Sequence, residues 1–168
     1  MLRVVNNPLL FEKAKEQVYK DFSEKDLFIP NGDGRRFLSQ CKIDPTIVKE
    51  SFSSFGINSF LSEPRFGNFI GNHYIDGAFV HKHTDNAPPG YQHVRCNFAI
   101  EMPTAGGNPL LDDEEIKIKV GDIWICFASL ECHSTTPIKG GQRLILSCGG
   151  LVESELAHKI YNEIKQLI

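Results

Sequence analysis

From residue 65 to residue 149 the sequence is a succession of short runs of aromatic and β-branched residues, separated by Gly, Pro, Asn and Asp. Such runs between turn-forming residues are typical of β-strands. We place them at 65–73, 78–84, 92–102, 115–119, 122–128 and 142–149. So many short strands in succession favour a mainly β fold, either a sandwich or a jelly roll.

Helical patterns flank this region. Apolar residues recur on one stripe from about Pro8 to Phe22, and Asp44-Pro45 is a typical start for a second, shorter helix. A further stripe follows in the last segment of the chain. A length of 168 residues suits one core. We therefore expect a single domain, 1–168, made of a helical support region, a β core and a carboxy-terminal helix at 1–60, 65–149 and 151–168.

Composition argues against several classes of function. The formal net charge is −3 and there is no long basic run, so tight non-specific binding of nucleic acid is not expected. The amino terminus is not basic-then-apolar, and no apolar run is long enough to span a bilayer. We expect no membrane association and a cytoplasmic location.

The five cysteines agree with a reducing compartment. Their number is odd, and no two are spaced as Cys-x-x-Cys. This argues against a disulfide framework or a zinc ribbon. We expect small core residues at Cys41, Cys96, Cys126, Cys132 and Cys148.

The segment His83-Thr84-Asp85 carries the strongest chemical signal. Side chains alternate along a strand, so His83 and Asp85 are expected on one face, where both can reach one ion. His133 follows the apolar strand 122–128, and a loop could bring it alongside them. Two histidines and one carboxylate can occupy one triangular face of an octahedral iron(II) centre, which leaves three positions open. His-x-Asp alone is a short motif that also occurs by chance.

His81 is a rival ligand, because strand alternation places it on the same face. A His81/His83 pair could bind zinc instead of iron. We favour His83 with Asp85, because this pair gives a mixed histidine–carboxylate face. His81 is then expected to line the mouth of a pocket or to be solvated. The other histidines, for which we see no partner pattern and expect structural or surface roles, are His73, His93 and His158.

Arg143 lies in an apolar strand next to Leu144, so its guanidinium is expected to be at least half buried. A buried arginine needs an anion, and its planar fork suits a carboxylate bound through two oxygens. Ser147 is expected on the same face and could add a hydroxyl. A structural salt bridge to an Asp or Glu of the chain is the alternative.

Three further residues are candidates for the same pocket. Tyr74 lies nine residues before His83, and its phenol could point into the same pocket. Arg95 and Asn97 share one face of the strand 92–102, and either could hydrogen-bond a polar substrate. Trp124 is expected in the core.

Together these residues resemble the iron(II)/2-oxoglutarate-dependent dioxygenases, and most of all their prolyl-hydroxylase-like branch. The resemblance runs from Tyr74 to Gly149, about half the chain. It rests on the order of the motifs, which are Tyr74, His83-Thr84-Asp85, Arg95, Gly106-Gly107, Gly121-Asp122, His133, Arg143 and Ser147. It implies a double-stranded β-helix, the jelly-roll variant that cupins also have, in agreement with the strand pattern.

The resemblance also implies the chemistry. The iron would be bound by His83, Asp85 and His133. Arg143 would pair with the far carboxylate of 2-oxoglutarate, with Tyr74 and Ser147 as helpers, and dioxygen would be the second co-substrate. Asn97 and Glu101 stand where prolyl hydroxylases more often have threonine and tyrosine, so a prolyl substrate does not follow.

Three hypotheses follow. The first is a hydroxylase that acts on an unactivated C–H of an amino acid, a peptide or a protein side chain and releases succinate and carbon dioxide. The second is a nucleobase dealkylase of the same chemistry, against which the absence of a basic patch counts. The third is a non-catalytic or zinc-binding module of cupin type, because a fold does not fix a function.

Overall fold

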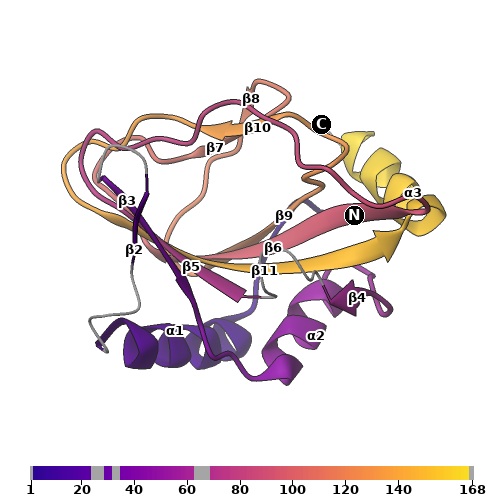
Figure 1. Ribbon diagram of the computed structural model, residues 1–168, viewed down its shortest axis with the longest axis horizontal. Coiled ribbons are helices and arrows are strands. Elements are labelled where there is room, and N and C mark those ends of the chain that lie inside the picture. Colours follow the sequence, from indigo (N-terminus) through magenta and orange to yellow (C-terminus); the bar gives the residue numbers. More distant parts are fainter. Residues whose placement is uncertain (1, 24–28, 32–34, 63–68, 167–168) are drawn as a thin grey trace.

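The computed structural model describes residues 2–23, 29–31, 35–62 and 69–166. Two antiparallel sheets face each other in it, with helices outside them (Figure 1). The major sheet runs in the order β1-β9-β6-β11-β5-β3-β2, with β4 paired to β11. Its strands are β1 (Val4–Asn6), β2 (Ile29–Asn31), β3 (Arg36–Gln40), β4 (Leu61–Ser62), β5 (Phe69–Tyr74), β6 (Tyr91–Glu101), β9 (Asp122–Cys126) and β11 (Arg143–Glu153).

The minor sheet covers the face of the major sheet that points away from the helices at the bottom of the view (Figure 1). Its order is β10-β7-β8. The strands are β7 (Pro109–Leu111), β8 (Glu114–Glu115) and β10 (His133–Thr135). Two packed antiparallel sheets of this kind confirm the predicted mainly β, jelly-roll fold with flanking helices.

Three helices complete the fold, and their starts follow from local chemistry. They are α1 (Pro8–Ser23), α2 (Pro45–Ser53) and α3 (Ser154–Lys165). The side chain of Asn7 accepts a hydrogen bond from Leu10 N at the start of α1, and Asp44 accepts one from Thr46 N at the start of α2. Such caps satisfy amide groups that the first turn of a helix leaves without a partner.

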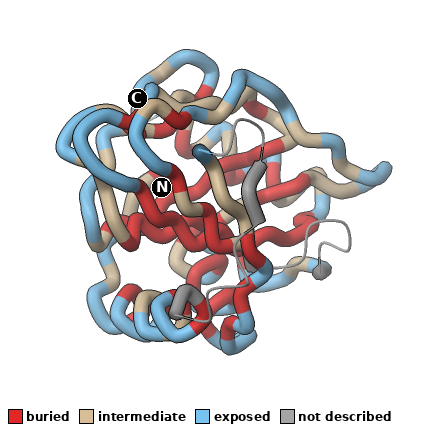
Figure 2. The backbone as a smooth tube through the Cα atoms, turned by 60° about the vertical axis from the view of Figure 1, so that its left-hand side comes forward, coloured by how far each residue is buried: buried red, intermediate tan, exposed pale blue. Residues whose placement is uncertain are grey.

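Strand alternation divides the major sheet into two chemically different faces. One face packs on α1 and α2 and forms the main apolar core, to which β11 contributes Leu144, Leu146 and Cys148. In Figure 2 the strands of the sheet are mostly buried, whereas the outward sides of the helices are exposed. The other face, with Arg143, Ile145 and Ser147, turns toward the minor sheet. The polar side chains of these strands are therefore gathered between the two sheets.

Several predicted elements differ in the structure. Residues 78–84 do not form a strand. An isolated bridge between His83 and His133 holds this segment, together with bonds between Val80 and Thr135 and one from Ile138 N to Ala78 O. Of the predicted strand 115–119, only Glu115 lies in a strand, at the end of β8. The predicted strand 65–73 is seen from Phe69 onward, and 65–68 lie outside the described residues.

The amino-terminal region, 1–60, contains the expected helices α1 and α2, but it also contributes β1, β2 and β3 to the major sheet. The cysteines behave largely as expected: Cys41, Cys96, Cys126 and Cys148 are buried and Cys132 is partly buried. No helix among the described residues is long and apolar enough to cross a membrane.

Candidate metal centre and ligand cavity

A cavity of about 420 Å³ lies between the two sheets. Its walls come from both, with β3, β5, β6, β9 and β11 on one side and β7 and β10 on the other. Apolar side chains such as Ile70, Leu111 and Ile145 form much of the lining. All the residues that the sequence analysis proposed for the metal centre, the co-substrate or the substrate, except His81, also line it.

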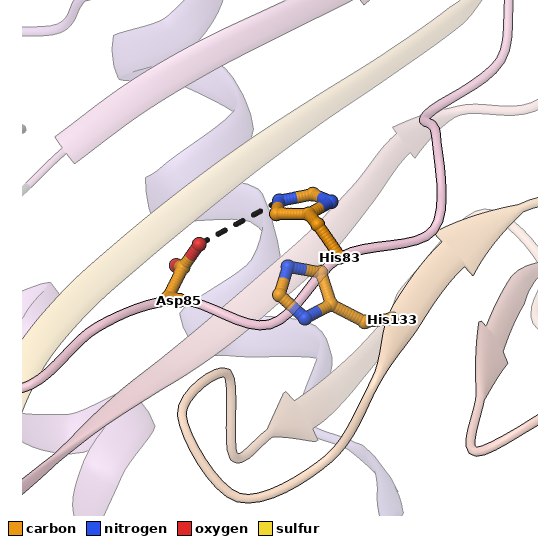
Figure 3. A group of neighbouring side chains, drawn as sticks. All are labelled: His83, Asp85 and His133. Carbon is orange, nitrogen blue, oxygen red and sulfur yellow. Dashed lines mark ion pairs between the residues drawn. The ribbon is translucent and has the colours of Figure 1, made fainter.

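His83, Asp85 and His133 lie together at this cavity. One ligand atom from each falls within 4.8 Å of the other two (Figure 3). The backbone sets this arrangement, because His83 N donates to His133 O over 3.1 Å and His133 N donates to His83 O over 2.8 Å. Asp85 N donates to Ala128 O over 2.7 Å. The three side chains are thus held by main-chain bonds that do not need a continuous strand.

Both histidines present the same ring nitrogen to the centre. Nδ1 of His83 donates to the carbonyl of His81 over 2.7 Å, and Nδ1 of His133 donates to the carbonyl of Glu131 over 3.4 Å. A carbonyl oxygen only accepts, so Nδ1 carries the proton and Nε2 keeps its lone pair. Nε2 of His83 lies 3.5 Å from Oδ1 of Asp85. Two Nε2 atoms and one carboxylate oxygen therefore converge on one point.

The electrostatics favour the forms that bind a metal. Burial lowers the pKa of His133, and the neighbouring His83 lowers it further, so its ring stays neutral. Burial alone would raise the pKa of Asp85, but hydrogen bonding to the His93 ring and the charge of Arg95 outweigh it and hold the pKa below its usual value. Neutral imidazoles and an ionised carboxylate are the states that coordinate a divalent ion.

His93 holds the second oxygen of Asp85. Its ring is fully buried, and its Nδ1 lies 2.9 Å from Oδ2 of Asp85. Arg95 approaches the same oxygen, with its Nε at 3.9 Å, and donates from Nη1 to Ser147 Oγ over 3.2 Å. Oδ1 of Asp85 is left to face the histidines. No spacing pattern links His93 to Asp85, so the structural or surface role expected of His93 from the sequence did not include this contact.

Arg143 is buried among aromatic rings rather than beside an acid. Its guanidinium carbon lies 5.1 Å from the ring centre of Tyr74 and 5.8 Å from that of Trp124. Its Nε is buried with no hydrogen-bond partner. Within the described part of the chain, no carboxylate lies within 4 Å of it, which rules out there the structural salt bridge considered above. Burial lowers its pKa, although an arginine stays protonated in proteins.

The remaining candidates also have definite places. Tyr74 is buried, and its hydroxyl donates to Asn72 Oδ1 over 3.4 Å. Asn97 is buried on the cavity side of β6. His81 is exposed, and its ring packs edge-on against Phe79 at 4.6 Å between centroids. Only its main-chain carbonyl contacts His83, so the alternative His81/His83 pair is not formed, and the exposed side chain agrees with the solvated position preferred for it.

Comparisons with known proteins identify the fold. The sequence matches no protein-family model and no curated protein. Among solved structures, the chain is similar to a prolyl hydroxylase from Trichoplax adhaerens, solved in complex with a peptide fragment of the hypoxia-inducible factor oxygen degradation domain. The TM-score is 0.64 and the identity is 13%, over 92% of this chain and 84% of that one. It is also similar to the viral collagen prolyl hydroxylase of Paramecium bursaria Chlorella virus-1, with a TM-score of 0.61 and 14% identity over 89% and 94%.

A third similar structure is a 2OG-Fe(II) oxygenase from Burkholderia pseudomallei, with a TM-score of 0.55 and 9% identity over 81% of this chain and 77% of that one. The chain has the fold of the 2OG-Fe(II) oxygenases. The double-stranded β-helix expected from the resemblance is therefore confirmed. The structural similarity covers much more of the chain than the segment from Tyr74 to Gly149. Identities this low describe the fold alone.

The residues present fit both an iron(II) ion and 2-oxoglutarate. The donor set of two imidazoles and one carboxylate suits a non-haem iron(II) centre with open positions. The buried Arg143, without a carboxylate among the described residues, would supply the charge that the far end of a dicarboxylate needs. Both features line one cavity.

Proposed function

We propose that this protein is a dioxygenase that depends on iron(II) and 2-oxoglutarate and hydroxylates an unactivated C–H of its substrate. The observation that carries the proposal is the pairing, in one cavity, of the His83–Asp85–His133 group with a buried arginine that has no acidic partner in the described residues. A metal-binding module without catalysis has no use for such an arginine, which is costly to bury.

His83, Asp85 and His133 would hold the ion on one face and leave the cavity side open. When bound, iron(II) and 2-oxoglutarate supply the oxidising chemistry, in which dioxygen is consumed and succinate and carbon dioxide are released. Arg143 fixes the far carboxylate, which limits the orientations of the co-substrate. Tyr74 and Trp124 flank this guanidinium and keep it in place.

The apolar part of the lining has its own task. Ile70, Ile145 and Leu111 enclose the space between the sheets and restrict the access of water. A dry site strengthens the ion pair of Arg143 and protects a reactive oxidant from side reactions.

The class of substrate stays open among small molecules, peptides and protein side chains. Two of the similar structures are prolyl hydroxylases, one of them with a bound peptide, which favours a peptide or protein. A nucleobase substrate is disfavoured by the net charge of −3 and by the absence of a basic run in the sequence. A cytoplasmic location agrees with the unpaired cysteines.

The proposal is tested by adding iron(II) and 2-oxoglutarate to the metal-free protein without oxygen. We expect a weak visible charge-transfer band. In Arg143→Gln, a higher concentration of 2-oxoglutarate should be needed to produce it. Admission of oxygen should then release succinate. A native protein that contains zinc and develops no band with iron(II) would instead support the cupin-type module.

A further inference from the structure

Arg36 and Arg143 lie on either side of Tyr74, at the same register position on three neighbouring strands. In the antiparallel register, Tyr74 of β5 is the partner both of Arg36 on β3 and of Arg143 on β11. In-register neighbours point to the same face of a sheet. The guanidinium carbons of Arg36 and Arg143 lie 5.4 and 5.1 Å from the centre of the Tyr74 ring. The sequence around Arg36 predicts no strand, so Arg36 was not among the expected site residues.

Arg36 is a half-buried cation without an acidic partner in the described residues. It lines the cavity, and its Nη2 donates to Asn72 Oδ1 over 3.3 Å. Its Nε is buried and has no hydrogen-bond partner. Asn72 also accepts from the hydroxyl of Tyr74. A neutral amide orients the guanidinium but does not balance its charge, so the site is built for an anion that comes from elsewhere.

The charges of the cavity show that this anion is additional to 2-oxoglutarate. Among the described lining residues, the arginines are Arg36, Arg95 and Arg143 and the carboxylate is Asp85. Iron(II) with Asp85 and the two carboxylates of 2-oxoglutarate would carry one net negative charge, which Arg143 balances. The charge of Arg36 then remains without a carboxylate among the described lining residues, and burying such a charge is unfavourable unless a ligand offsets it.

We propose, on the basis of the function proposed above, that Arg36 anchors a carboxylate of the substrate. The planar fork of an arginine beside a neutral amide matches a carboxylate better than a neutral ring such as proline. The substrate carries no free ammonium beside that carboxylate, because Asp85, the acidic residue among those described in the lining, is already held by His93. The class is therefore small organic acids without an amine, or Asp and Glu side chains of a peptide.

The test uses protein loaded with manganese(II), which prevents turnover, and saturated with 2-oxoglutarate. N-acetylglycine is compared with its amide, and acetyl-Gly-Glu-Gly-amide with the Gln peptide, by calorimetry. The first pair represents small acids and the second represents peptides. We expect the acid of at least one pair to bind roughly tenfold more tightly than its amide, as a charged hydrogen bond implies. Arg36→Gln should reduce this ratio to about one.

Arg35→Gln is the matched control, since Arg35 is the exposed neighbour of Arg36 and lies outside the cavity lining. It should keep the wild-type preference. Equal affinity for acid and amide in the wild-type protein, or no binding of either acid, would overturn the inference. So would tighter binding of acetyl-Gly-Pro-Gly-amide than of both acids.

A separate titration tests whether Arg36 binds the substrate or is a second residue that binds 2-oxoglutarate. The affinity for 2-oxoglutarate is measured without substrate in Arg36→Gln and in Arg143→Gln. The inference expects a large loss only in Arg143→Gln, and equal losses in both variants would contradict it. If the wild-type protein fails to bind 2-oxoglutarate at all, the proposed function has failed, which is visible before any substrate is added.

Discussion

Nδ1 of His93 lies 2.9 Å from Oδ2 of Asp85, while Oδ1 of the same carboxylate faces His83. A carboxylate held in this way offers a single oxygen to an ion, in a fixed direction. Groups that orient metal ligands typically contribute a factor of roughly 10–100 to metal affinity. His93 is thus a positioning residue for the candidate centre.

We expect His93→Leu to weaken manganese(II) binding by roughly 10- to 100-fold, measured by competition with a chromophoric chelator. His93→Asn retains a donor and should recover part of the affinity. His158→Leu, on the exposed side of α3, is the control. If His93→Leu binds the ion as wild type while its melting temperature falls, His93 serves packing alone.

The unpaired burial of Arg143 predicts opposite effects on stability and on binding. Arg143→Met removes a buried charge that lacks an acidic partner among the described residues, so the ligand-free protein should be as stable as wild type or more stable. It should lose roughly 10- to 100-fold in 2-oxoglutarate affinity, the value of a charged hydrogen-bond pair, and little in metal affinity.

Thermal unfolding with and without 2-oxoglutarate measures both quantities for Arg143→Met. Arg143→Lys keeps the charge without the fork and should be intermediate. Equal losses of metal and 2-oxoglutarate affinity would show that Arg143 maintains the fold of the site rather than binding the co-substrate.

The positions of the histidines predict a clear contrast between two alanine variants. His133→Ala removes an Nε2 atom from the centre and should abolish succinate release. The ring of His81 packs on Phe79, and only its carbonyl contacts His83. His81→Ala should therefore retain metal affinity within about twofold, since surface substitutions usually have small effects. A large loss in His81→Ala would restore His81 as a ligand.

A buried ion pair supports the turn that carries His133. Nη1 of Arg3, on the segment that enters β1, lies 2.8 Å from Oε1 of Glu131, and both side chains are almost fully buried. The same oxygen accepts from Phe127 N. Removing one partner of a buried pair typically costs about 3–5 kcal/mol. We expect Arg3→Met to lower the free energy of unfolding by about this amount at pH 8.

The pH dependence of this loss identifies its cause. Burial raises the pKa of Glu131, so its contribution to stability is present in acid and is lost as the pH rises through the folded-state value. The deficit of Arg3→Met in urea unfolding should therefore be smaller at pH 5 than at pH 8. The double variant with Glu131→Leu should recover most of the stability at both pH values. A pH-independent deficit would point to lost packing of Arg3.

The sequence predicted those parts of the site that depend on local periodicity. Arg143 and Ser147 lie in a regular strand, and alternation correctly placed both on the cavity face of β11. His83 and Asp85 came together for a different reason from the one expected, since a bridge to His133 and a bond to Ala128 replace the strand. The same wrong strand explains the misplacement of His81.

Contacts between distant segments could not be read from spacing. His93 reaches Asp85 across a turn that contains two prolines, and no regular period relates the two residues. Arg36 belongs to a five-residue strand whose pairing with β5 depends on long-range packing. β1 and β10 are three-residue strands, too short for any sequence period to show.

The backbone bridge between His83 and His133 has a consequence for the stability of the unloaded protein. Besides that bridge, the segment 78–88 is held by a few main-chain bonds, such as Thr135 N to Val80 O and Asp85 N to Ala128 O, but it forms no continuous ladder with either sheet. An ion bound to the side chains of His83 and His133 would close a long loop and hold the segment 78–88 against β10, as a covalent cross-link would. Without the metal, the segment 78–88 should unfold locally before the rest of the domain. Amide exchange at His83, Asp85 and His133 should then be faster than in the core of β11. The metal would therefore stabilise this segment of the chain, in a site whose geometry the main-chain bonds already set.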